Sequence, residues 1–107
     1  NIRRSLGALP ATFQAMGRSG AFLQSMLQLE DAAGKNLDEQ VRQLIALAVS
    51  AANGCSYCVH SHTAAARAKG MTPAQHAEFM AIVGLAAKTN QIATALQVPV
   101  DAAFEAG

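Results

Sequence analysis

The stretch NGCSYCVHSH, residues 53–62, holds both cysteines and two of the three histidines of this 107-residue chain. If it opens a helix, the Cys-x-x-Cys spacing places Cys55 and Cys58 one turn apart on one face, and His62 follows one turn later. His60 then points away from this strip. Unpaired N–H groups and the helix dipole stabilise a thiolate at a helix N-terminus. The pattern therefore predicts a reactive cysteine pair beside an imidazole.

Three other uses of the cysteines fit the pattern less well. A structural zinc site joins two ligand pairs across a longer loop, whereas here every candidate ligand lies on one short segment, so we expect no metal. Covalent haem attachment needs a histidine directly after the second cysteine, and Val59 occupies that position. A purely structural disulfide of this spacing would constrain the unfolded chain very little. We therefore interpret the pair as redox-active, and we expect no bound cofactor.

Composition limits the class of protein. The length predicts one domain, residues 1–107, and 51% apolar against 14% charged residues is a low charge content for a small soluble chain. We therefore expect a homo-oligomer in which another copy covers apolar surface. The formal net charge of +1 argues against nucleic acid or an anionic membrane as a partner, because both attract a basic patch.

The longest uncharged segment runs between Arg42 and Arg67. Its strongly apolar part is only Leu44 to Ala52, far short of the ~20 residues that a membrane span needs. A single cysteine pair at redox spacing favours a reducing cytoplasm over an oxidising exterior. The chain does not begin with Met, so we expect upstream residues to be missing or removed.

The whole chain is expected to be helical. Alanine, leucine, glutamine and methionine are frequent, aromatic residues make up 5%, and no segment alternates as a strand does. Caps and breakers predict a compact all-α bundle of about six helices, with the Cys-x-x-Cys pair at the N-terminus of the fourth. The expected helices run from about residue 10 to 17, 19 to 34, 38 to 54, 55 to 70, 72 to 86 and 90 to 97, followed by a short turn capped by Asp101.

The third expected helix should be central, because from Leu44 onward it is apolar all round. One side carries Leu47 and Ser50, and the other is an apolar stripe of Val41, Leu44, Ile45, Ala48, Val49 and Ala52. The clearest helix start is Thr72-Pro73-Ala74-Gln75, which combines a cap, a proline at the first helical position and a glutamine three residues after the cap.

The segments RQLIALAVS (residues 42–50) and NGCSYC (residues 53–58), with His62, closely resemble the carboxymuconolactone decarboxylase and alkyl hydroperoxidase D family. The resemblance covers residues 37–70 specifically and the flanking helices loosely. It implies an alkyl hydroperoxidase D-like helical fold assembled as trimers or hexamers. It also implies peroxide reduction by the cysteine pair, with an external dithiol such as lipoamide as donor or a peroxiredoxin as partner.

The resemblance also assigns roles to individual residues. Cys58 would attack the peroxide, Cys55 would be its resolving partner, and His62 would belong to the proton relay. The family usually places a glutamate twelve positions before the first cysteine, where this chain has Gln43. A glutamine can hydrogen-bond His62, but it does not exchange a proton near neutral pH. We therefore expect weakened peroxidase activity.

Three further residues are candidates for the relay or the pocket. Glu39 lies one helical turn before Gln43 and could reach the site through a water, although a simple ion pair with Arg42 is the commoner role for such a carboxylate. Tyr57 and His60 match common variation in the family, and we assign them minor roles in lining the pocket.

The sequence thus predicts a thiol-dependent peroxidase, a disulfide-cycling antioxidant protein that reduces hydroperoxides. Two alternatives stay open. In one, the cysteine pair is a non-enzymatic redox sensor that switches an interface, for which a weakened relay matters little. In the other, the protein is an enzyme of the decarboxylase branch that acts on a small lactone.

Overall fold

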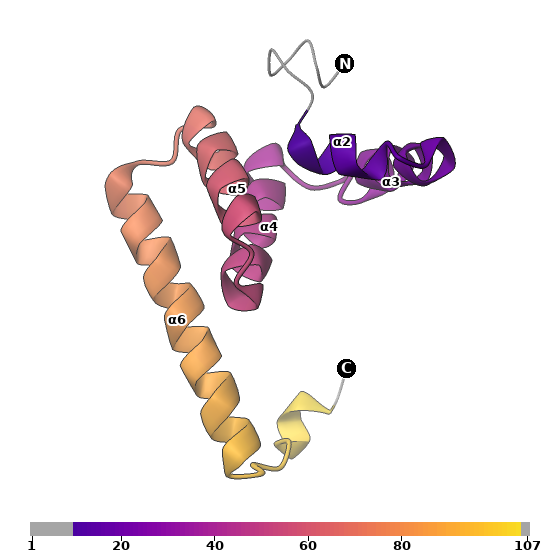
Figure 1. Cartoon of the computed structure of the whole chain (residues 1–107). Coiled ribbons are helices and arrows are strands. Elements are labelled where there is room, and N and C mark those ends of the chain that lie inside the picture. The colour runs from indigo at the N-terminus through magenta and orange to yellow at the C-terminus, as the bar shows by residue number, and fades with distance from the viewer. Residues whose placement is uncertain (1–9, 106–107) are drawn as a thin grey trace. The chain divides into compact units, whose positions relative to one another are not determined.

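The computed structural model describes residues 10–105, and this part of the chain is helical without strands (Figure 1). The predicted all-α fold is confirmed, with the cysteine pair at the start of α5, the fourth α-helix of the described part. The elements are α2 (Ala11–Met16), α3 (Gly20–Ala32), α4 (Glu39–Asn53), α5 (Ser56–Ala68), α6 (Pro73–Ala95) and the 3₁₀ helix η1 (Ala102–Phe104).

The chain divides into two units, residues 1–38 and 39–107, which are described separately. A single domain over residues 1–107 stays a prediction. In the first unit α2 and α3 pack against each other. Ser19 caps α3, as predicted, because its hydroxyl accepts a hydrogen bond from the Phe22 N–H.

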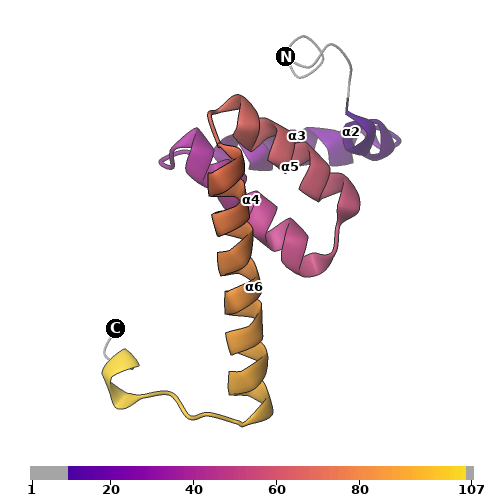
Figure 2. The ribbon, with the colours of Figure 1, turned by 90° about the vertical axis from the view of Figure 1, so that its left-hand side faces the viewer.

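The second unit is built on a hairpin of α4 and α5, which lie side by side in both ribbon views (Figures 1 and 2). Gly54 makes the connection with a φ of 73°, a conformation that glycine adopts without strain. Leu47 on α4 and Ala66 on α5 are fully buried, and Met71 after α5 is 6% exposed. The centre of this small core therefore lies between the two helices.

α4 is buried on one side only, whereas a central, buried helix was predicted. Leu47 and Ser50 face the core, whereas Val41, Ile45 and Val49 of the predicted stripe are 41–54% exposed. Both sides of the helix are apolar, so periodicity alone could not select the side that α5 covers. The expected central helix is therefore covered on one side only in the single chain.

α6 starts as predicted but extends further. The Thr72 hydroxyl accepts from the Gln75 N–H at 3.1 Å, and the Thr72 N–H donates to Gln75 Oε1 at 2.9 Å, which completes the capping box. The predicted break before residue 90 is wrong, because α6 runs unbroken to Ala95. Neither Gly nor Pro interrupts residues 85–98, so nothing ends the helix earlier. Asp101 precedes η1, but its side chain makes no capping hydrogen bond.

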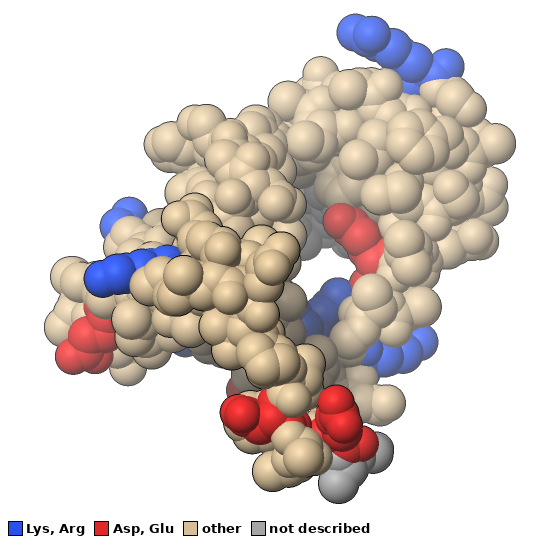
Figure 3. Space-filling view, turned by 90° about the horizontal axis from the view of Figure 1, so that it is seen from below, with Lys and Arg blue, Asp and Glu red and all other residues tan. Residues whose placement is uncertain are grey.

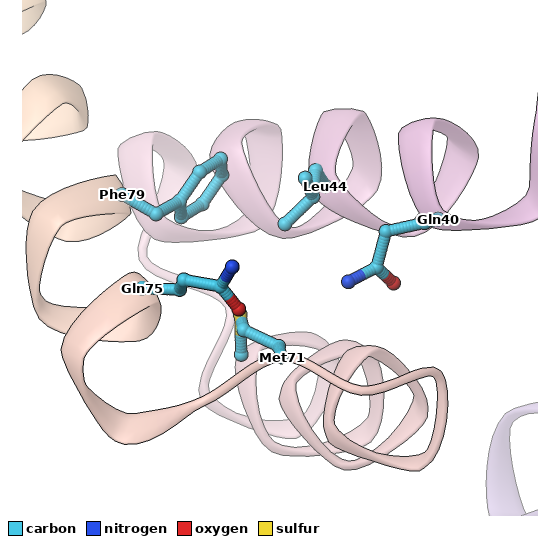
Figure 4. A pocket seen from close by; sticks show the side chains of 5 residues that line it. All are labelled: Gln40, Leu44, Met71, Gln75 and Phe79. Carbon is cyan, nitrogen blue, oxygen red and sulfur yellow. The ribbon is translucent and has the colours of Figure 1, made fainter.

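α6 meets α4 near its first turns. Its half-buried residues recur at helical spacing: His76, Phe79, Met80, Val83 and Ala87. A pocket of about 250 Å³ lies here, lined by Gln40 and Leu44 of α4, Met71, and Gln75 and Phe79 of α6 (Figure 4). None of these residues belongs to the predicted cysteine–histidine strip.

Charged side chains are sparse on the surface. On the face shown in Figure 3, basic and acidic side chains lie in separate small groups among uncharged residues, and some basic groups lie beside acidic ones. None of the described helices combines the length and the apolar character needed to cross a bilayer.

Candidate active site

The cysteine pair forms the first turn of α5. Cys55 is the N-cap residue, with extended backbone angles, and Cys58 lies three residues later. Their Cα atoms are 5.3 Å apart, and the two sulfurs are joined in a disulfide. Both residues are half-buried. The sulfurs therefore meet without rearrangement of the helix, as the spacing predicts.

The free N–H groups at the start of α5 act on one sulfur in particular. The Cys58 N–H donates to Cys55 Sγ at 3.3 Å, so this sulfur fills the place that a serine or aspartate oxygen takes in an ordinary cap. From the sequence, helix-terminal stabilisation was expected for the reactive thiolate, which the resemblance assigns to Cys58. The structure directs this hydrogen bond to Cys55.

His62 connects the two helices of the hairpin. It is half-buried, and its Nδ1 lies 2.9 Å from Oε1 of Gln43 on α4. An amide oxygen only accepts hydrogen bonds, so Nδ1 donates, and in the neutral imidazole Nε2 carries the lone pair. On its own helix, His62 lies one turn beyond Cys58 on the same face. The predicted contact between Gln43 and His62 is therefore present.

Glu39 extends this connection along α4. Its Oε1 accepts a hydrogen bond from Gln43 Nε2 at 2.9 Å, and its Oε2 lies 3.4 Å from Arg42 Nη1. The predicted ion pair with Arg42 is present. The direct bond to Gln43 was missed, because only a water-mediated route was considered, although the i, i+4 spacing of Glu39 and Gln43 predicts a direct contact.

The two remaining candidates, His60 and Tyr57, are both exposed. His60 Nδ1 is 2.8 Å from the Ser56 carbonyl oxygen, so the ring bonds the backbone of its own helix and is exposed. Tyr57 is 43% exposed. Among residues 10–105, no group of three or more His, Cys, Asp or Glu side chains could hold a metal ion.

Comparison with known proteins identifies the family. The model of the carboxymuconolactone decarboxylase family matches residues 20–101, which is most of the chain. The chain belongs to this family. The resemblance inferred from residues 37–70 is thereby confirmed over a longer segment.

Two relatives place the chain within the carboxymuconolactone decarboxylase family. Alkyl hydroperoxide reductase AhpD of Maricaulis maris is 40% identical over 76 residues, which are 71% of this chain and 42% of that protein. The chain thus spans less than half of the length of this curated relative. The crystal structure of an alkylhydroperoxidase AhpD core from Rhodospirillum rubrum matches with a TM-score of 0.85 and 49% identity. That match covers 99% of this chain and 82% of the other.

Proposed function

We propose that this protein is a thiol-dependent hydroperoxidase that cycles between a dithiol and the Cys55–Cys58 disulfide. The observation that carries the proposal is the disulfide in the first turn of α5, one helical turn before a histidine held by α4. The names of the two relatives support the same chemistry. Half-burial of both cysteines leaves room for a small peroxide to reach a sulfur.

The proposed reaction has three balanced steps. The Cys58 thiolate attacks the terminal oxygen of a hydroperoxide ROOH, the O–O bond breaks, and Cys58 becomes a sulfenic acid while RO⁻ takes a proton to leave as ROH. The Cys55 thiol then displaces water from the sulfenic acid and forms the disulfide. An external dithiol finally reduces this disulfide by two thiol–disulfide exchanges and is itself oxidised to a disulfide.

His62 is the proton carrier in this scheme. Its Nε2 accepts the proton of the Cys58 thiol, and the imidazolium so formed favours the thiolate. The same proton can then be given to the departing RO⁻. Cys58 is assigned the attack because it is the cysteine one turn from His62, whereas Cys55 is two turns away.

The donor is proposed to be a small dithiol such as lipoamide, or else the protein recycles a peroxiredoxin. Either needs a reducing compartment such as the cytoplasm. We also infer that copies of the chain assemble as a trimer or hexamer. Exposed apolar side chains support this inference: Ile45 and Val49 on α4 are 51% and 54% exposed, and Ile82 and Leu85 on α6 are 65% and 64% exposed.

The test compares Cys58→Ser with Cys55→Ser. Reduced protein is mixed with an organic hydroperoxide, and peroxide consumption and sulfenic acid, trapped with dimedone, are followed. Both variants should lose turnover, and only Cys55→Ser should accumulate a trapped sulfenic acid, because its attacking sulfur remains without a resolving partner. Trapping in Cys58→Ser alone would reverse the two roles. Consumption by Cys58→Ser at the parent rate would refute the proposal.

A redox-switched interaction subunit is the second candidate, and Gln43 supports it. A site whose His62 is bonded to an amide, which does not exchange protons, suits a slow switch as well as a fast enzyme. This candidate predicts that disulfide formation changes the molecular mass in solution without peroxide turnover. Light scattering of the reduced and oxidised protein separates it from the peroxidase.

The decarboxylase branch of the family gives a third test. A lactone decarboxylase would not need the sulfurs, so activity on a small lactone that survives replacement of both cysteines by alanine would support that branch over the peroxidase.

A further inference from the structure

Glu39, Gln43 and His62 form a chain of hydrogen bonds with a fixed direction. The Gln43 side chain has one accepting end, Oε1, and one donating end, Nε2. The Glu39 carboxylate can only accept, so it requires Nε2 to face it, as observed at 2.9 Å. Oε1 is thereby turned toward His62 Nδ1, also at 2.9 Å.

We propose that Glu39 is a positioning residue that acts through Gln43 to hold His62 in the tautomer protonated on Nδ1. This inference rests on the proposed function only for its last link, the transfer of the Cys58 proton to Nε2. Glu39 moves no proton itself. Its carboxylate fixes the orientation of the Gln43 amide. The amide oxygen then fixes which nitrogen of His62 carries the proton, although Glu39 itself does not contact His62.

The opposite orientation of the Gln43 amide is disfavoured by its contact with Glu39, and it would change the tautomer of His62. A flipped Gln43 amide would place Oε1 against the Glu39 carboxylate, so two acceptors would face each other with no proton between them. Its Nε2 would then face Nδ1, which could only accept, and the ring proton would move to Nε2. Arg42 holds the second Glu39 oxygen, which helps to keep the carboxylate in place.

The three residues of this hydrogen-bonded chain differ in their exposure to solvent, in a way that fits a positioning role for Glu39. Gln43 and His62 are half-buried, whereas the Glu39 side chain is 44% exposed. Of the three residues, the charged one is therefore the most exposed to solvent, and the two less exposed side chains include the neutral amide of Gln43. A neutral imidazole with a defined lone pair needs such an orienting partner to act as a base.

The test reads the tautomer directly. In the reduced protein, ¹⁵N NMR of the His62 ring should show the proton on Nδ1 and a free Nε2 in the neutral form. Glu39→Gln has the same shape, but its amide can accept or donate, so Gln43 is free to flip and a mixture of tautomers should appear. Glu78→Gln, an exposed site on α6, is the control with the same change of charge, and it should keep one tautomer.

A double variant provides the rescue. In Glu39→Gln/Gln43→Glu, the carboxylate lies directly beside His62 and again only accepts, so the single tautomer protonated on Nδ1 should return. The rate of thiol oxidation by peroxide should fall about two- to tenfold in Glu39→Gln, as the competent tautomer becomes less populated. It should return to at least the parent rate in the double variant, in which residue 43 is also a carboxylate able to exchange protons, so the tautomer is the deciding readout.

The outcomes separate this proposal from the peroxidase assignment. An unchanged tautomer in Glu39→Gln, or a proton found on Nε2 in the parent, would overturn the role of Glu39. The predicted tautomers with no peroxide consumption in the parent would leave the role of Glu39 in place and refute the peroxidase.

Discussion

The α4–α5 hairpin and α6 are stabilised by different interactions. The hairpin contains fully buried side chains, Leu47 and Ala66, and a side-chain hydrogen bond between its helices. The 23-residue α6 has a complete capping box, but none of its residues is buried. The hairpin is thus held mainly by packing within the chain, whereas α6 combines a complete cap with a smaller contact to α4 and presents apolar surface outward. The candidate chemistry lies entirely on the packed part.

The largest effect should come from the core of the hairpin. Leu47→Ala removes a fully buried side chain and should lower the free energy of unfolding by about 2–5 kcal/mol. Urea denaturation of dilute, reduced protein measures this change. The matched substitution on α6 is Leu85→Ala, which removes a side chain that is 64% exposed.

In dilute solution, Leu85→Ala should stay within about 0.5 kcal/mol of the parent. Its effect should grow with protein concentration, because assembly would bury Leu85, while the effect of Leu47→Ala should not. Equal losses of unfolding free energy for the two variants at every protein concentration would show that the hairpin and α6 do not differ in how they are stabilised.

The next effect concerns assembly. Leu85→Glu places a charge on the exposed apolar surface of α6, so it should weaken association of copies by at least the ~1.5–3 kcal/mol that burial of a leucine contributes. Light scattering over a concentration series measures the mass. Gln91→Glu adds the same charge at an exposed polar site of α6 and should leave the mass unchanged. Identical masses for the parent and Leu85→Glu would place the interface elsewhere.

The smallest effect is at the cap of α6. Thr72→Ala removes the hydroxyl that accepts from the Gln75 N–H and should cost about 0.5–2 kcal/mol. Hydrogen exchange should quicken in the first turn of α6. Thr89→Ala is the control, since its hydroxyl only bonds the Leu85 carbonyl within the helix, and this change should be nearly neutral. Equal exchange in both variants would mean that α6 does not depend on its cap.

The sequence predicted features that depend on neighbouring residues. The capping box at Thr72 and the meeting of Cys55 with Cys58 are set within one helical turn, so spacing alone is enough. The contact between Gln43 and His62 spans 19 positions, and the resemblance to the family pointed to it. These predictions did not require knowledge of how the helices pack.

Features that depend on packing were harder to predict. α4 is apolar on both sides, so only the position of α5 decides that Leu47 is buried and Ile45 is exposed. The continuity of α6 through Asn90 was missed because a polar asparagine was taken as a helix start, although neither Gly nor Pro lies in the five residues before it. The ion pair of Glu39 with Arg42 was predicted correctly. A carboxylate has two oxygens, however, and the hydrogen bond of the other oxygen to Gln43 was overlooked.

The cap of α5 has a practical consequence. The Cys58 N–H donates to the Cys55 sulfur, so in the proposed cycle this amide contacts a sulfur that passes between thiol and disulfide. The amide resonance of Cys58 is therefore a built-in redox indicator. If the pair cycles as proposed, this resonance should report the dithiol and disulfide populations without a dye, a trapping agent or a substrate.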